Sequence, residues 1–109
     1  MMKNLEISAI FREIANILEI KGDNPFRIRA YERAAQNIEG LTEDIEDFVR
    51  DDRLTEISGI GKDLSERVKE FILNGRIKIY EDLKKTIPKG LLDLLNIPLG
   101  EFIKNYMDG

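Results

Sequence analysis

The chain has 109 residues, with 42% hydrophobic and 35% charged side chains and a net charge of −4. It contains neither cysteine nor histidine, which excludes disulfides, thiol chemistry, Cys/His zinc sites and imidazole catalysis. No apolar run approaches the roughly 20 residues of a membrane helix, and the charged N-terminal segment is not a signal peptide. The length fits one domain, and the composition fits a cytoplasmic protein without a membrane partner.

The charge is distributed unevenly along the chain. Residues 1–52 hold 7 basic and 12 acidic side chains, a net of −5, whereas residues 53–109 hold 10 and 9, a net of +1. The acidic excess is concentrated in segment 43–52, and basic residues recur in segment 62–78. A negative net charge argues against a simple basic DNA-binding protein. The distribution nevertheless fits either a basic face opposite an acidic one or an ordinary solvated helix surface.

The hydrophobic pattern predicts helices throughout and no strand. A first helix is predicted over residues 4–19, ending at Gly22. A second is predicted to begin with Asn24 as N-cap and Pro25 at its first position, and to end at Gly40. Its predicted inner face consists of Phe26, Ala30, Tyr31, Ala34, Ala35 and Ile38.

The second half of the chain is predicted to contain shorter helices. Thr42 is predicted to cap an acidic helix, two short helices packed on each other follow, and a further helix ends before Pro88. The predicted core positions of these helices are Ile45, Phe48, Val49, Leu54, Ile57, Ile60, Leu64, Val68, Phe71, Ile72, Ile79, Tyr80 and Leu83.

These elements predict one all-α domain, a compact bundle of short helices over residues 1–109. We expect a helical subdomain over 1–52, a helix-hairpin-helix over 53–76, and a helical tail over 77–109. The tail contains Ile97-Pro98-Leu99-Gly100, which is similar to the hairpin sequence but lacks one glycine.

Gly59-Ile60-Gly61 is the most informative motif. Two glycines one residue apart allow a tight turn with positive φ, and a helix is predicted to begin near Lys62. The first amides of a helix lack internal partners and carry the positive end of its dipole, so a phosphate can approach them. The motif is typical of a helix-hairpin-helix, which binds nucleic-acid backbone without reading bases; a plain helix–helix connection is the alternative. A dinucleotide-binding fingerprint and a P-loop do not fit the sequence around the glycines.

Residues 3 to about 98 resemble the amino-terminal domain of the X-family DNA polymerases, most closely the bacterial and archaeal branch. The resemblance rests on segment 19–35, which includes Asn-Pro-Phe-Arg-Ile-Arg-Ala-Tyr, and on segments 54–75 and 87–92. It implies a domain like the amino-terminal domain of DNA polymerase beta. Such a domain binds DNA without sequence specificity, at gaps or 5′-phosphate ends, in DNA repair or synthesis.

The resemblance also implies roles for individual residues. The carbonyl oxygens of Thr55, Ile57 and Ile60 would bind a monovalent cation, Na⁺ or K⁺, and no other cofactor is expected. Tyr31 has a purely structural alternative as a core residue, and one of the arginines on its helix has an alternative as the ion-pair partner of an acidic neighbour, Glu19 or Asp23. The implied DNA contacts are Gly59, Ile60, Gly61, Lys62, Arg67, Arg27, Arg29, Tyr31 and Arg33.

The sequence departs from the family where catalysis is concerned. Arg67 occupies the position of the lysine that forms a Schiff base in members with lyase activity, and arginine stays protonated. Lys69 lies about 200° further round an ideal helix and does not replace that lysine. No polymerase palm carboxylates are present, so we expect no catalysis by this chain itself, although a parent protein would be a DNA-directed DNA polymerase. Whether the chain stands alone or is part of such a polymerase is open.

A second hypothesis is a protein-interaction domain that keeps the fold without DNA binding. The acidic segment 43–52 would form its partner-binding face, and the isoelectric point of about 4.9 supports this view. A carboxylate metal site in the same segment is less favoured than a solvated helix face.

Overall fold

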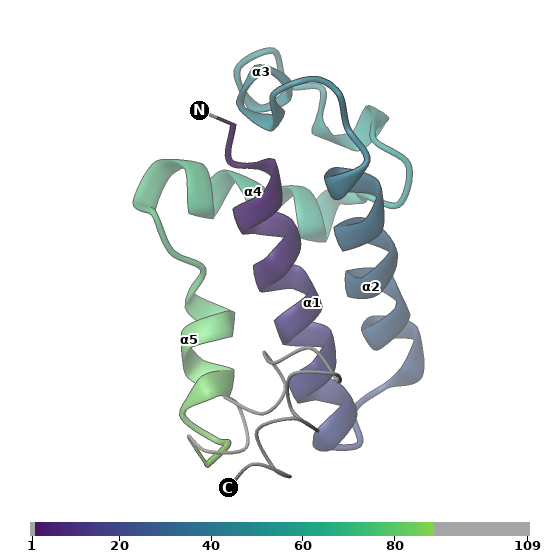
Figure 1. Ribbon diagram of the computed structural model, residues 1–109, viewed down its shortest axis with the longest axis vertical. Helices are drawn as coiled ribbons and strands as arrows, with labels where there is room; N and C mark the ends of the chain where they lie inside the picture. Colours follow the sequence, from purple (N-terminus) through teal and green to yellow (C-terminus); the bar gives the residue numbers. More distant parts are fainter. Residues whose placement is uncertain (1, 89–109) are drawn as a thin grey trace, which may run out of the picture.

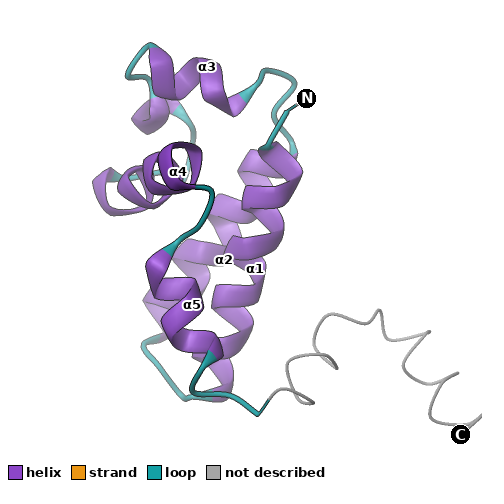
Figure 2. Ribbon diagram, turned by 90° about the vertical axis from the view of Figure 1, so that its left-hand side faces the viewer, coloured by secondary structure: helices purple, strands orange, loops and turns teal. Residues whose placement is uncertain are grey.

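A computed structural model describes residues 2–88 of the chain. Within that range all regular structure is helical, which confirms the all-α prediction. Figures 1 and 2 show α1 and α2 as an antiparallel pair, with α4 crossing them near one end and α5 running along α1. The elements are α1 (Asn4–Ile20), α2 (Pro25–Glu39), α3 (Ile45–Arg50), the 3₁₀ turn η1 (Leu54–Glu56), α4 (Lys62–Asn74) and α5 (Lys78–Lys84).

The pairing of α1 with α2 forms the centre of the core. On α1 the buried residues recur every three or four positions, and on α2 two small side chains, Ala34 and Ala35, let the helices approach closely. Phe11 and Tyr31 meet edge to face, with ring centroids 5.3 Å apart and an interplanar angle of 88°. The predicted cap of α2 is confirmed, because the side chain of Asn24 accepts a hydrogen bond from the amide of Phe26 at 2.8 Å.

The predicted inner face of α2 is wrong at two positions. Phe26 is 77% exposed and Ala30 is also exposed, whereas Ile28 is half-buried and packs against the core. Successive residues of a helix are about 100° apart, so the buried face that contains Tyr31 and Ile38 also contains Ile28. Phe26 and Ala30 fall outside this face.

The start of α3 also differs from the prediction. Asp44, not Thr42, is the N-cap, and its carboxylate accepts from the amide of Glu46 at 2.9 Å. The cause is a contact with α1: buried Asn4 donates from Nδ2 to the carbonyl of Glu43 at 2.8 Å and accepts at Oδ1 from the amide of Ile45 at 2.9 Å. The predicted core positions on α3 are confirmed except that Val49 is only half-buried.

The first arm of the predicted helix pair over 53–76 is much shorter than a helix. Only the 3₁₀ turn η1 precedes the glycines, and α3 comes before it, while α4 forms the second arm as predicted. Gly75 ends α4 in the left-handed conformation, with φ +74°. The carboxylate of Glu70 then accepts from the amide of Lys78 at 2.8 Å, which stabilises the start of α5.

The predicted core of the second half is otherwise confirmed. Leu54, Ile57, Ile60, Leu64, Val68 and Phe71 are buried, and Ile72, Ile79, Tyr80 and Leu83 are partly buried against the same cluster. The second hairpin sequence at 97–100 and most of the predicted tail lie outside the described residues. Within residues 2–88, no helix is long and apolar enough to cross a membrane.

Candidate nucleic-acid interface

The turn at Gly59 has the backbone conformation that the motif predicts. Gly59 has φ +84°, which disfavours any residue with a Cβ, and the amide of Ile60 donates to the carbonyl of Ile57 at 3.0 Å. Ile60 is buried and packs the turn onto the core. Gly61 differs: its φ of −90° and ψ of −170° are extended values open to other residues. The positive φ is therefore required of Gly59, while Gly61 is the N-cap of α4.

The N-terminus of α4 is open to a ligand. No side chain caps it within the described residues, and a Cβ built on Gly61 would meet nothing within 4 Å. The amides of the first turn lack intrahelical partners, and the 13-residue helix adds the positive end of its dipole. Lys62 at the first position is exposed and makes no ion pair with residues 2–88. This arrangement can accept an anion.

Helix α2 holds the turn in place through two side chains. Asn37 donates from Nδ2 to the carbonyl of Ser58. A Cβ built on Gly59 would lie 2.9 Å from Asn37 Nδ2 and 3.2 Å from Arg33 Cγ, so both side chains lie against the turn. Arg33 is exposed and has no ion-pair partner in the described part of the chain. Sequence reasoning found Arg33 but missed Asn37, since its contact joins residues 21 positions apart.

A second group of predicted residues gathers around the Tyr31 hydroxyl. Burial raises the pKa of Tyr31; the positive charges of Arg27 and Arg67 act to lower it, and the carboxylate of Asp63 acts to raise it. The ring of Tyr31 packs in the core against Phe11, which confirms the structural alternative that Tyr31 is a core residue. Tyr31 thus packs through its ring and presents its hydroxyl to two arginines.

Both arginines of this group are partly engaged by carboxylates. Arg27 forms an ion pair with Asp23 at 3.4 Å. This is the structural alternative that the sequence analysis named for one arginine of this helix. Arg67 Nε lies 3.5 Å from Glu70 Oε1, but the geometry is not that of a hydrogen bond, and this buried Nε lacks a hydrogen-bond partner among residues 2–88. Lys69 forms ion pairs with Asp52 at 3.7 Å and with Glu66 at 3.6 Å. Arginine, and not this lysine, therefore faces the Tyr31 group.

The remaining predicted contact, Arg29, lies apart from both groups. Its guanidinium lies 5.4 Å from the ring centroid of exposed Phe26. The structure thus divides the predicted DNA-contacting residues into a turn group (Gly59, Ile60, Gly61, Lys62 and Arg33), a Tyr31 group (Arg27, Tyr31 and Arg67) and the separate Arg29.

Several acidic side chains of segment 43–52 have partners within the domain. Asp44 caps α3, Asp47 pairs with Arg50 at 2.9 Å, and Asp52 pairs with Lys69 at 3.7 Å. Among the described residues, no three carboxylates are grouped in a way that could hold a metal ion. These contacts give the acidic residues local structural roles.

Comparison with known proteins identifies the family. A helix-hairpin-helix domain model matches residues 2–77. The chain belongs to this helix-hairpin-helix family. It is 36% identical over 97 residues to the DNA polymerase/3′-5′ exonuclease PolX of Bacillus subtilis (strain 168), which confirms the resemblance to X-family polymerases. The match covers 89% of this chain but 16% of the relative. Membership of the helix-hairpin-helix family supports nucleic-acid binding in general.

Proposed function

We propose that this helix-hairpin-helix domain binds the DNA backbone without sequence preference, at gaps or 5′-phosphate ends, during DNA repair or synthesis. It would act as part of an X-family DNA polymerase or as a relative of one. The observation that carries the proposal is the N-terminus of α4 beside the Gly59 turn, which no side chain of residues 2–88 caps. Arg33 and Lys62 flank it, and neither forms an ion pair within the same range. Backbone amides and side-chain cations together suit a phosphodiester. A role on DNA also fits the cytoplasmic location that the composition predicts.

The Tyr31 group supports a preference for terminal phosphates. A terminal phosphate has a second pKa of about 6 and so carries more negative charge near neutral pH than a phosphodiester. Arg27 and Arg67 supply two guanidinium groups, and the nearby hydroxyl of Tyr31 supplies a further donor. Asp63 opposes this attraction, but its single negative charge is outnumbered by the two guanidinium groups, so the net positive charge of the group still favours the more strongly charged anion.

We also propose that the turn holds a Na⁺ or K⁺ ion next to the bound phosphate. The ligands would be the carbonyl oxygens of Thr55, Ile57 and Ile60, because backbone carbonyls can replace the hydration shell of such ions. The Ile57 oxygen accepts from the amide of Ile60, and its second lone pair remains for a cation.

Direct binding measurements test the proposal. With about two to four phosphate contacts, the logarithm of the association constant should fall with the logarithm of salt concentration with a slope of about −2 to −4. Fluorescence anisotropy at several salt concentrations would compare gapped, 5′-phosphorylated and intact duplex DNA of one sequence. We expect the tightest binding to the gapped, phosphorylated form. Equal affinity for all three would refute the end preference, and no binding at low salt would refute DNA binding itself.

Lyase chemistry is expected to be absent. Borohydride treatment of the protein with a 5′-deoxyribose-phosphate substrate should trap no adduct, because Arg67 cannot form the Schiff base and Lys69 is held by Asp52 and Glu66. A lyase that carries the lysine serves as the positive control. A stoichiometric adduct that persists in the Arg67→Ala variant would contradict the prediction.

The second hypothesis, a protein-interaction domain, relies on the acidic segment 43–52. Asp44, Asp47 and Asp52 each interact with groups of the same domain, so much of the negative charge in this segment needs no external partner to explain it. The open, positively flanked turn has no such internal explanation, so DNA binding is the better supported function.

A further inference from the structure

The Gly59 turn has one of two backbone conformations that its hydrogen bond allows. The amide of Ile60 donates to the carbonyl of Ile57 at 3.0 Å, which closes a turn with Ser58 and Gly59 at its centre. Gly59 has φ +84° and Ser58 does not have a positive φ, so the turn is of type II. A type I turn closes the same hydrogen bond with its central peptide rotated by about 150–170°. The peptide between Ser58 and Gly59 can therefore face either way.

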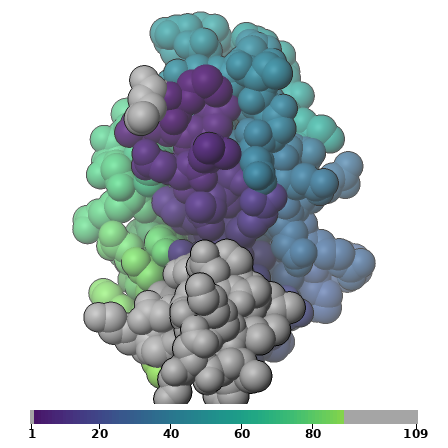
Figure 3. All heavy atoms as spheres, viewed as in Figure 1, coloured from purple at the N-terminus to yellow at the C-terminus, as the bar shows by residue number. Residues whose placement is uncertain are grey.

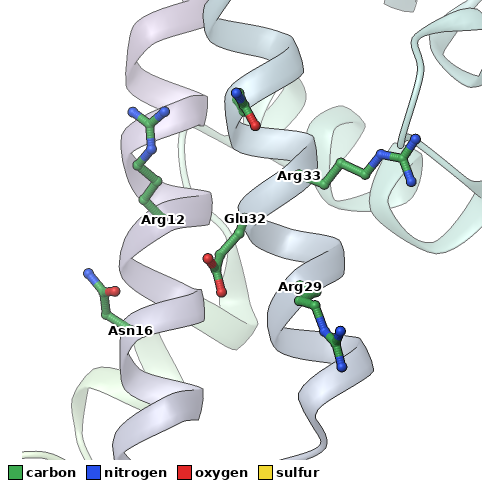
Figure 4. Close-up of a pocket in the computed structure, with 6 residues that line it drawn as sticks. Arg12, Asn16, Arg29, Glu32 and Arg33 are labelled. Carbon is green, nitrogen blue, oxygen red and sulfur yellow. The ribbon is translucent and has the colours of Figure 1, made fainter.

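Asn37 of α2 is placed to select one of these two orientations. Figure 3 shows α1 and α2 side by side on one face of the molecule, and Figure 4 shows Arg33 of α2 extending away from α1. Asn37 follows Arg33 by about one helical turn, and both lie against Gly59, since a Cβ added there would be 2.9 Å from Asn37 Nδ2 and 3.2 Å from Arg33 Cγ. Asn37 Nδ2 donates to the carbonyl of Ser58. Because this peptide is trans, the N–H of Gly59 points away from Asn37.

The direction of the Gly59 amide decides whether the exposed side of the turn offers a donor or an acceptor. Ser58 and Gly59 are exposed, and the Gly59 amide donates to no group among residues 2–88. It lies two residues before Gly61, the N-cap of α4, so it adds a donor beside the free amides of that helix. In the type I orientation the carbonyl oxygen of Ser58 would face outward instead. A carbonyl oxygen cannot donate to a phosphate.

We propose that Asn37 is a positioning residue for DNA binding, which keeps the Gly59 amide turned toward the DNA backbone by holding the carbonyl of Ser58. This inference rests on the proposed function. Type I is the commonest turn, so without Asn37 the rotated peptide competes with the observed one. Affinity falls in proportion to the fraction of molecules that hold the binding orientation. Asn37 therefore contributes to affinity without touching the DNA.

The first test examines the free protein and needs no DNA. Asn37→Asp keeps the size of the side chain but replaces the donor with an acceptor, which repels the Ser58 carbonyl and can accept from the Gly59 amide after rotation. Crystal structures of the wild type and this variant should show φ of Gly59 changing from +84° to about −90°, the type I value. A loss of packing alone would not rotate the peptide. Retention of the type II turn in the variant would overturn the proposal.

The second test measures binding to gapped, 5′-phosphorylated DNA by fluorescence anisotropy. Asn37→Leu removes the donor without adding charge and should weaken binding about 10-fold, the effect of one lost hydrogen bond to a charged group. The factor should be the same at every salt concentration, because no cation is lost. A loss accompanied by a changed salt slope would assign the effect to a displaced Arg33 and overturn the proposal.

Asn74→Leu is the matched control. Asn74 is an exposed amide at the opposite end of α4, and its side chain forms no hydrogen bond with residues 2–88. Its substitution should leave affinity unchanged. Equal affinities of the two leucine variants would overturn the role of Asn37 and leave the proposed function standing, whereas no DNA binding by the wild type would refute both. Should Asn37→Leu fail to fold in circular dichroism, Asn37→Asp is titrated instead, with Asn74→Asp as the control of equal charge.

Discussion

The Gly59→Ala variant is expected to lose about 2–3 kcal/mol of unfolding free energy and about 10-fold or more in DNA affinity. The backbone at φ +84° disfavours alanine by about 1–2 kcal/mol. The new Cβ would lie 2.9 Å from Asn37 Nδ2, so Asn37 must move and its hydrogen bond to Ser58 is lost, at about 1 kcal/mol. Moving the turn also misplaces the α4 amides, and one lost hydrogen bond to a charged phosphate is worth about 1.5–3 kcal/mol.

Gly75→Ala provides the matched control. Gly75 has φ +74°, but a Cβ there would meet nothing within 4 Å, so this variant carries the backbone cost without the clash. Urea unfolding followed by circular dichroism should show a loss of about 1–2 kcal/mol, and anisotropy should show unchanged DNA affinity. If both variants were equally destabilised and bound DNA equally well, the contacts of Asn37 and Arg33 with the turn would have no role.

The second large effect is expected for Asn4→Ala, which should cost about 2–4 kcal/mol. Asn4 is 3% exposed, and its side chain satisfies both the carbonyl of Glu43 and the amide of Ile45. Alanine would leave the buried amide of Ile45 and the part-buried carbonyl of Glu43 without that partner, and an unsatisfied buried group costs about 1–3 kcal/mol. Because α3 leads into η1 and the Gly59 turn, loosening its start should also increase hydrogen exchange at the hairpin.

Ser8→Ala is the comparison for Asn4→Ala. Ser8 is equally buried and donates one hydrogen bond, at 2.8 Å, to the carbonyl of Ala35 within α2. A helix carbonyl keeps its intrahelical partner, so this change should cost only about 0.5–1.5 kcal/mol and leave hairpin exchange unchanged. Urea unfolding of both variants gives the difference. A cost for Asn4→Ala no greater than that for Ser8→Ala would show that Asn4 does not organise the start of α3.

The sequence predicted the features whose causes are local. Asn24 and Pro25 specify the start of α2 within one turn, and the Gly59 turn is recognisable because no side chain can easily adopt its backbone conformation. The core positions of α4 follow from helical periodicity alone. The resemblance to the X-family polymerases also placed Arg67 where members with lyase activity carry a lysine.

The features that the sequence did not predict depend on contacts between distant residues. The phase of the α2 face was decided by where α1 packs, which buries Ile28 and leaves Phe26 in solvent. The start of α3 depends on Asn4, whose side chain accepts a hydrogen bond from the amide of Ile45, 41 positions further along the chain.

The candidate site shows the same division between local and distant causes. The motif specified the turn itself, but Asn37 holds that turn from 21 positions away, and no local pattern marks such a side chain. Arg29 and Arg33 are four residues apart on one helix, yet only Arg33 lies against the turn. The sequence by itself therefore determined which backbone could bind a phosphate. The tertiary structure alone decided which side chains surround it, because that depends on how α1, α2 and α4 pack.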